Sequence, residues 1–89
     1  MAEDSDFEFE VNGCYFWTDA LQEGERMYRG RIHVTKVGNE TIEPPFKFKM
    51  PETRIYLEDA HREATAHAKL IAASGAMKTL VEAWRSSCN

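Results

Sequence analysis

The sequence predicts an α+β fold in which a three- to four-stranded antiparallel β-sheet, a meander, packs against a C-terminal α-helix. Two observations support this prediction. Through residues 7–50, apolar residues alternate with polar ones, which is the period of a half-buried strand. From about residue 58 onward, apolar residues recur every three to four positions, as in an amphipathic helix. With 89 residues, the chain has room for a single domain.

The chain divides into a frayed acidic amino terminus, residues 1–6, and one α+β domain, residues 7–86. Turn residues and prolines separate the strands, and the change of period marks where the helical part begins. The predicted strands span residues 7–11, 14–21, 26–37 and 42–50, and the predicted helices span 58–74 and 76–86.

The first two strands are expected to form a hairpin around Asn12-Gly13, because both residues tolerate the positive φ of a tight turn. A single strand with a bulge at this point is the alternative. In the hairpin, apolar residues share one face and acidic residues lie opposite aromatic ones on the other. The expected pairs are Val11–Cys14, Phe9–Phe16, Phe7–Thr18, Glu10–Tyr15 and Glu8–Trp17.

The next strands are expected to follow turns around residues 22–25 and at Gly38-Asn39. The double proline Pro44-Pro45 cannot donate ladder hydrogen bonds. The last strand therefore lies at a sheet edge or begins after these prolines, and it ends at Pro51. The residues expected to face the helix are Tyr28, Ile32, Val34, Phe46, Phe48 and Met50.

The helical segment has two apolar faces that do not line up. Ala60, Ala64, Ala68 and Ile71 form a stripe that lets the helix approach the sheet closely, and Glu58 and Asp59 favour the start of the helix. Beyond Gly75 the apolar positions are rotated away from this stripe. Either the helix is broken or kinked near Gly75, or its second face binds something else.

This second face carries the leading functional hypothesis. It consists of Met77, Leu80, Val81 and Trp84, at the spacing of one helical face. These residues either fold back into the protein's own core or form an interface with a protein partner or a second copy. The sequence therefore predicts a small non-enzymatic protein that mediates protein–protein interaction or self-association.

The alternative function is nucleic-acid binding by the exposed face of the sheet. Cations would line neighbouring strands there beside Tyr15 and Trp17, as in sheets that bind phosphates and stack bases. The candidate contacts are Arg29, Arg31, His33, Lys47 and Lys49. Against this, the first 25 residues carry eight acids and no base, and the net charge is −4, so Glu8 and Glu10 can neutralise the same surface.

No pattern predicts a catalytic, cofactor, metal or small-molecule site. On a helix, His61 and His67 are turned about 120° from one another and cannot chelate one metal ion. The two cysteines, Cys14 and Cys88, do not make a disulfide framework. A cytoplasmic protein without membrane contact is expected, because the amino terminus is acidic and no apolar run approaches membrane-spanning length.

The layout resembles a family of small uncharacterised bacterial proteins in which an antiparallel β-meander precedes one long helix. Three segments carry the resemblance: Val11-Asn12-Gly13-Cys14-Tyr15, Tyr28-Arg29-Gly30-Arg31-Ile32, and Glu58-Asp59-Ala60 with Ala64 and Ala68. The resemblance implies the same fold and carries no known activity.

Overall fold

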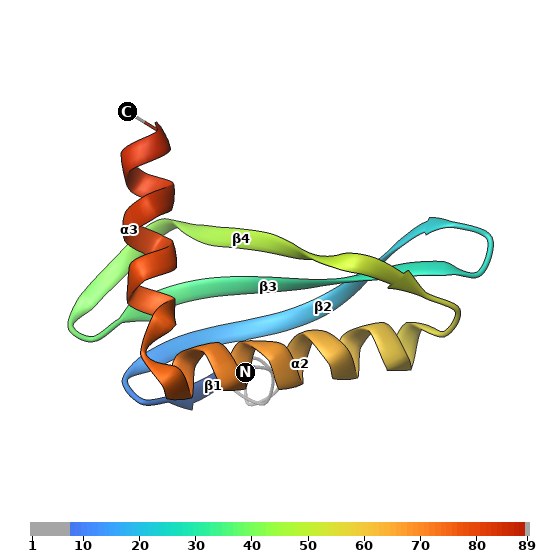
Figure 1. Ribbon diagram of the computed structural model, residues 1–89, viewed down its shortest axis with the longest axis horizontal. Helices are drawn as coiled ribbons and strands as arrows, with labels where there is room; N and C mark the ends of the chain where they lie inside the picture. Colours follow the sequence, from blue (N-terminus) through green and yellow to red (C-terminus); the bar gives the residue numbers. More distant parts are fainter. Residues whose placement is uncertain (1–7, 89) are drawn as a thin grey trace, which may run out of the picture.

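The computed structural model of the protein describes residues 8–88. Four strands form one antiparallel sheet in the order β1-β2-β3-β4, and two helices follow them (Figure 1). This arrangement confirms the α+β class and the antiparallel meander. The elements are β1 (Glu8–Val11), β2 (Cys14–Gly24), β3 (Met27–Val37), β4 (Glu40–Arg54), α2 (Leu57–Ser74) and α3 (Ala76–Cys88).

The hairpin at Asn12-Gly13 is confirmed, with φ angles of 54° and 81° at the two turn residues. Val11 lies opposite Cys14, and the next three pairs of β1 and β2 follow the predicted register. The expected pair of Phe7 with Thr18 lies outside the described residues. Because the turn has two residues and no bulge interrupts this ladder, the acidic side chains of β1 point away from the helix.

The strands differ from the sequence predictions chiefly at the β2–β3 turn and in β4, which is longer than predicted at both ends. The β2–β3 turn lies at Glu25-Arg26 rather than at residues 22–25, and Arg26 adopts a φ of 58°. β4 does not end at Pro51 but continues to Arg54. Pro44, Pro45 and Pro51 all fall in the two stretches where the register between β3 and β4 shifts, between Thr41 and Phe46 and between Lys49 and Thr53. The edge strand β4 can therefore hold prolines, because they lie outside the regular part of the ladder.

α2 covers one face of the sheet and lies close against it at Gly30. A Cβ atom at that residue would lie 2.5 Å from the Ala60 carbonyl oxygen and 2.8 Å from the Ala64 Cβ atom. The alanine stripe is buried, and it continues at Ala72. Small side chains on the helix and a glycine on β3 therefore allow the close contact that buries Phe16 in the core.

α2 and α3 are separate helices, with Gly75 between them at a φ of 87°. The Gly75 N–H donates to the Ala72 carbonyl oxygen at 3.2 Å. α3 rises from this point at the end of the sheet (Figure 1). Its buried residues, Met77 and Val81, join the core formed by the sheet and α2.

At the end of the molecule near Gly75, hydrogen bonds connect elements that are distant in sequence. The Gly38 N–H donates to the Gly13 carbonyl oxygen at 2.8 Å, which links the two strand turns. The Asn12 side-chain amide donates to the Ala72 carbonyl oxygen at 3.2 Å, which links the first turn to α2.

Candidate edge-strand groove

β1 is shorter than the strand with which it pairs. It has four residues and β2 has eleven, and their pairing begins at Glu8 opposite Trp17. Among residues 8–88, only β3 pairs with β2 beyond this point. We call Thr18–Gln22 the free edge of β2.

The main-chain groups along the free edge alternate in direction. Val11 and Cys14 flank a two-residue turn and so form a hydrogen-bonded pair, and such pairs recur at every second residue. The even-numbered residues of β2 therefore turn their N–H and C=O groups toward β1. Beyond β1, the main-chain groups of Thr18, Ala20 and Gln22 point to the free edge, whereas those of Asp19 and Leu21 point to β3.

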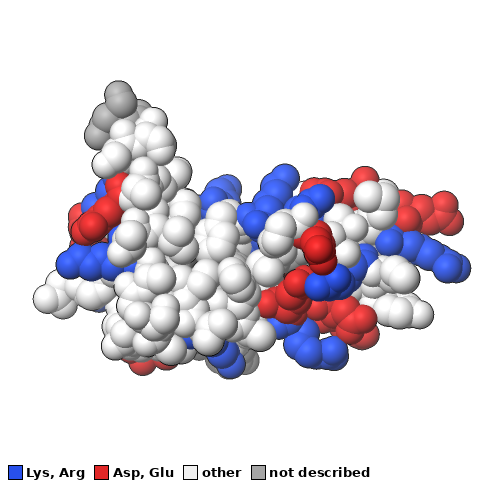
Figure 2. All heavy atoms as spheres, in the orientation of Figure 1, with Lys and Arg blue, Asp and Glu red and all other residues white. Residues whose placement is uncertain are grey.

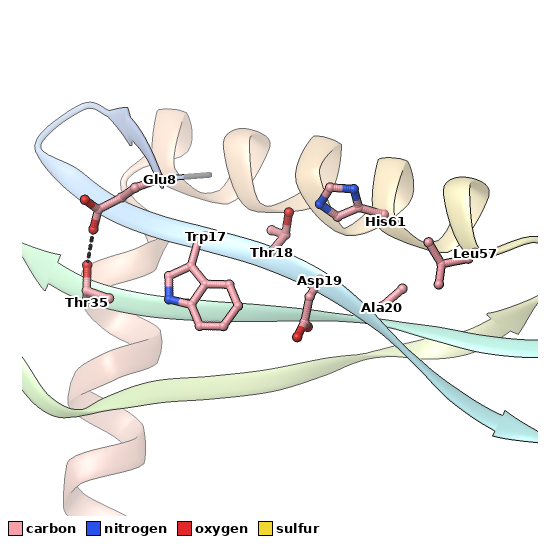
Figure 3. A pocket seen from close by; sticks show the side chains of 8 residues that line it. All are labelled: Glu8, Trp17, Thr18, Asp19, Ala20, Thr35, Leu57 and His61. Atoms are coloured by element: carbon pink, nitrogen blue, oxygen red, sulfur yellow. Dashed lines mark hydrogen bonds between the residues drawn. The ribbon is translucent and has the colours of Figure 1, made fainter. Parts of the chain in front are cut away.

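A hollow of about 640 Å³ follows the free edge, between the strand and the beginning of α2. Figure 3 shows its lining side chains on both sides of β2, some on the outer face of the sheet and others toward the helix. We call this hollow the edge groove. Its lining residues are Glu8, Trp17, Thr18, Asp19, Ala20, Thr35, Leu57 and His61.

The helix side of the edge groove is fixed by a hydroxyl pair. The Thr18 and Thr65 Oγ1 atoms lie 2.7 Å apart, and the Thr65 hydroxyl also donates to the His61 carbonyl oxygen at 3.0 Å. These bonds hold the first half of α2 beside β2. Leu57 and His61, one helical turn apart, therefore face the strand across the groove (Figure 3).

The outer side of the edge groove is fixed by an aromatic stack and a charge cluster. The rings of Trp17 and His33 lie 3.7 Å apart and parallel within 1°. Two guanidinium N–H groups of Arg31 donate to the Asp19 carboxylate, at 2.6 and 2.9 Å. His33 Nε2 lies 3.2 Å from the same carboxylate. At the near end, the Thr35 hydroxyl donates to the Glu8 carboxylate at 2.7 Å.

These contacts set the charges of the cluster. Burial lowers the pKa of His33 below its ordinary value, and it outweighs the hydrogen bond to Asp19, so the imidazole is neutral at pH 7. Burial by itself raises the pKa of Asp19, but the hydrogen bonds from Arg31 and His33 outweigh it and hold that pKa below its ordinary value. The hydrogen bond to Asp19 raises the pKa of Arg31. Asp19 and Arg31 are therefore an ion pair.

Large apolar side chains are exposed at the end of the molecule where α2 begins. Ile55 and Tyr56, between β4 and α2, are 58% and 64% exposed. Leu57, which lines the groove, is 49% exposed, and Met27 at the start of β3 is 44% exposed. We call these four residues the end patch. Three of them, residues 55–57, are consecutive in the sequence and expose apolar surface where the chain passes from β4 to α2.

The four residues of the predicted α3 interface differ in how far they are buried. Met77 and Val81 are buried in the core of the chain itself, and Trp84 packs against that core with its ring centroid 5.0 Å from that of Phe46. Leu80 is 36% exposed. These positions correspond to the folded-back arrangement that the sequence left open, and only Leu80 faces outward to a substantial extent.

The predicted nucleic-acid contacts lie on the outer face of the sheet, but most are engaged with other groups. Arg29 forms an ion pair with Glu23 at 3.0 Å, and Lys49 lies 3.9 Å from the same glutamate. Arg31 is paired with Asp19, His33 is only 5% exposed under Trp17, and Lys47 is exposed. Figure 2 shows acidic and basic side chains interspersed around the β2–β3 end, while the face over α3 is largely uncharged.

Within residues 8–88, no cluster of three or more His, Cys, Asp and Glu residues is arranged to hold a metal ion. In the same range, no helix is both long enough and apolar enough to cross a bilayer. Burial and the nearby Glu10 carboxylate raise the pKa of the Cys14 thiol, which disfavours the reactive thiolate.

Comparison with protein-family models, curated proteins and solved structures finds no match for this chain. The candidate site therefore depends on the geometry of the chain itself.

Proposed function

We propose that the protein is a protein-interaction module that binds an extended segment of a partner along the free edge of β2. The observation that carries this proposal is the edge groove, one wall of which is the free edge at Thr18 and Ala20, where main-chain groups are directed outward. An extended segment placed there adds a strand to the sheet, and the main-chain hydrogen bonds supply affinity. The opposite wall, formed by Leu57 and His61, gives its side chains a surface to contact.

This site is favoured over the α3 face and over the outer sheet face. Self-association through α3 would rely on Leu80, because its neighbours Met77 and Val81 are already buried within the chain. Nucleic-acid binding would rely chiefly on Lys47, because Arg29 and Arg31 have carboxylate partners.

Hydrogen exchange of individual amides tests the proposal. The Ala20 and Gln22 amides are expected to exchange rapidly in the free protein and to become protected when a blocked peptide of alternating valine and threonine is added. The Asp19 and Leu21 amides donate toward β3 and serve as internal references, protected in both states. Protection of Ala20 and Gln22 in the free protein would show that another segment already covers the edge, and would refute the proposal.

A matched pair of leucine variants tests the opposite wall. Leu57→Asp is expected to weaken peptide binding by about tenfold, because it places a charge in the apolar part of the edge groove. Leu70→Asp changes a leucine of the same helix that is 68% exposed and does not line the groove, and it is expected to leave binding unchanged. Calorimetric titration measures both, and equal losses in the two variants would contradict the groove as the binding site.

A further inference from the structure

The side chains around the free edge specify what kind of segment fits. We infer, resting on the proposed function, that the edge groove selects an extended segment with lysine or arginine opposite Asp19 and an apolar residue opposite Ala20. Successive side chains of a strand point to opposite faces of the sheet. The residue opposite Asp19 therefore points to the outer face, and the next one points toward α2.

The outer position is bordered by carboxylates. The lining of the edge groove includes Glu8 and Asp19 and no lysine or arginine. A segment that continues the line of β1 past Glu8 brings its residue opposite Asp19 within two positions of Glu8 along the same line. Arg31 binds Asp19 from β3, on the side of β2 away from the free edge, so it does not fill this position.

Glu8 is the more available of the two carboxylates. Its Oε2 atom accepts one hydrogen bond, from the neutral Thr35 hydroxyl, and the residue is exposed. Asp19 is charged and already neutralised by Arg31. A cation in the outer position therefore meets a net negative charge from Glu8, and an anion there is repelled. The Trp17 ring beside both carboxylates offers an apolar surface for the stem of a long cationic side chain.

The inner position is bordered by Leu57 and His61, and Leu57 also belongs to the end patch. The side chain of the bound segment opposite Ala20 has only a methyl group as its cross-strand neighbour, so it has room to reach α2. A branched apolar side chain at this position buries part of the exposed Leu57 surface.

Charge also argues against a second copy of the chain as the occupant of the groove. A second copy that pairs through its own β2 edge would bring a second Asp19 to the same face. A basic foreign segment avoids this conflict.

The test compares blocked peptides that differ at one residue. The first, acetyl-Thr-Val-Thr-Val-Lys-Val-amide, places lysine opposite Asp19 and its last valine opposite Thr18 when it pairs antiparallel to β2, so it stops short of Glu8 opposite Trp17. The second peptide has glutamate in place of lysine. The lysine peptide is expected to bind the full-length protein about fivefold more tightly, and the preference is expected to decline with added salt. Equal affinities for the two peptides would overturn the inference.

A charge reversal in the protein supplies the reciprocal test. Glu8→Lys is expected to remove or invert the preference between the two peptides. Glu82→Lys, an equal change of net charge on the exposed side of α3, is the control and is expected to preserve the preference. If Glu82→Lys shifts the preference as strongly as Glu8→Lys, the effect reflects overall charge and the inference is refuted.

A third peptide separates this inference from the proposed function. It carries the lysine but is N-methylated at the valines flanking it, which removes main-chain donors. If lysine and glutamate peptides bind equally and N-methylation abolishes binding, strand addition holds and the charge preference fails. If no peptide binds, both fail. A concentration-dependent mass above 10.2 kDa that peptide does not change would indicate that a second copy fills the groove, which also overturns the inference.

Discussion

His33 lies on the face of the sheet opposite the one that α2 covers, and yet only 5% of it is exposed. Trp17, its neighbour on β2, lies flat on the imidazole and shields it from solvent. A neutral imidazole is well suited to this position, because it stacks on the indole and still meets the Asp19 carboxylate through Nε2. The outer face is therefore organised by side-chain contacts between neighbouring strands.

Burial of His33 makes the stability of the fold depend on pH. Its folded-state pKa lies below the ordinary value of about 6.5, so the unfolded chain takes up a proton at pH values where the folded chain does not. The free energy of unfolding is therefore expected to fall as the pH drops below about 6.5, and this loss ends below the folded-state pKa. Asp19 adds a further loss at lower pH, because its pKa is also depressed.

Urea unfolding of His33→Asn between pH 5 and 7.5 measures this effect. The variant is expected to be less stable than the wild type at pH 7.5 and to lose less stability on acidification. His67→Gln, on the exposed face of α2, is the control. The same pH dependence in wild type and His33→Asn would exclude the imidazole as its source.

Gly30 is the residue on which the distance between sheet and helix depends. Gly30→Ala is expected to reduce the free energy of unfolding by about 1–3 kcal/mol, because the added methyl group meets the backbone of α2 at Ala60. Gly24→Ala is the control, since the atom closest to its added Cβ is the Sδ of the flexible Met27 side chain, at 3.1 Å. Denaturant midpoints measure both, and similar losses would contradict the close approach.

At the scale of elements, one face of α3 packs against the rest of the protein. Met77 and Val81 lie within the core, and Trp84 reaches Phe46 on the edge strand β4. Arg85 adds an ion pair with Glu40 at the start of the same strand. α3 therefore covers the end of the sheet that α2, interrupted at Gly75, does not reach.

Two truncations on α3 test this packing. Trp84→Ala is expected to lower the free energy of unfolding by about 2–4 kcal/mol, since it removes a large ring from a partly buried contact. Leu80→Ala is expected to cost less than about 1 kcal/mol, because Leu80 is the more exposed residue. If the order were reversed, and Leu80→Ala also lowered the mass in sedimentation, α3 would instead be an intermolecular interface.

The elements differ in how far the sequence determines them. The register of β1 and β2 follows from Asn12-Gly13, because a two-residue turn leaves one pairing that keeps Phe9 and Phe16 on the same face. The register of β2 and β3 was less accessible, since the acidic segment before Arg26 allows several turns. Without that register, the sequence did not reveal that Trp17 stacks on His33, and it predicted the histidine to be exposed.

The edge groove was missed for a related reason. It depends on the difference in length between β1 and β2, and on α2 lying beside the longer strand. One signal was present: Ala20 continues the alternation of β2 past Thr18, the last residue that the predicted first strand, residues 7–11, pairs with. Propensity and periodicity describe one segment at a time, whereas a groove is a property of three segments together.

For the whole molecule, acidic and basic residues that are separated along the sequence lie next to one another in the folded sheet. Two acidic residues of β2 lie beside basic residues of the neighbouring strand β3, where Glu23 pairs with Arg29 and Asp19 with Arg31. A 20-nucleotide RNA or DNA probe is therefore expected not to bind at low salt, as measured by fluorescence anisotropy. Binding that weakens steeply as salt is added would contradict this and support the outer face as a nucleic-acid surface.

The hydrogen bonds from Gly38 to Gly13 and from Asn12 to Ala72 have a consequence for motion. They join two turns and a helix end at one pole of the molecule, whereas the opposite pole, around Met27 and Ile55, consists of a projecting hairpin and exposed side chains. Local unfolding should therefore begin at the pole around Met27 and Ile55, and the pole held by these hydrogen bonds should open last. A strand that binds beside β2 would lie in the part of the sheet expected to open most readily. Binding should therefore reduce local opening there more than elsewhere in the protein.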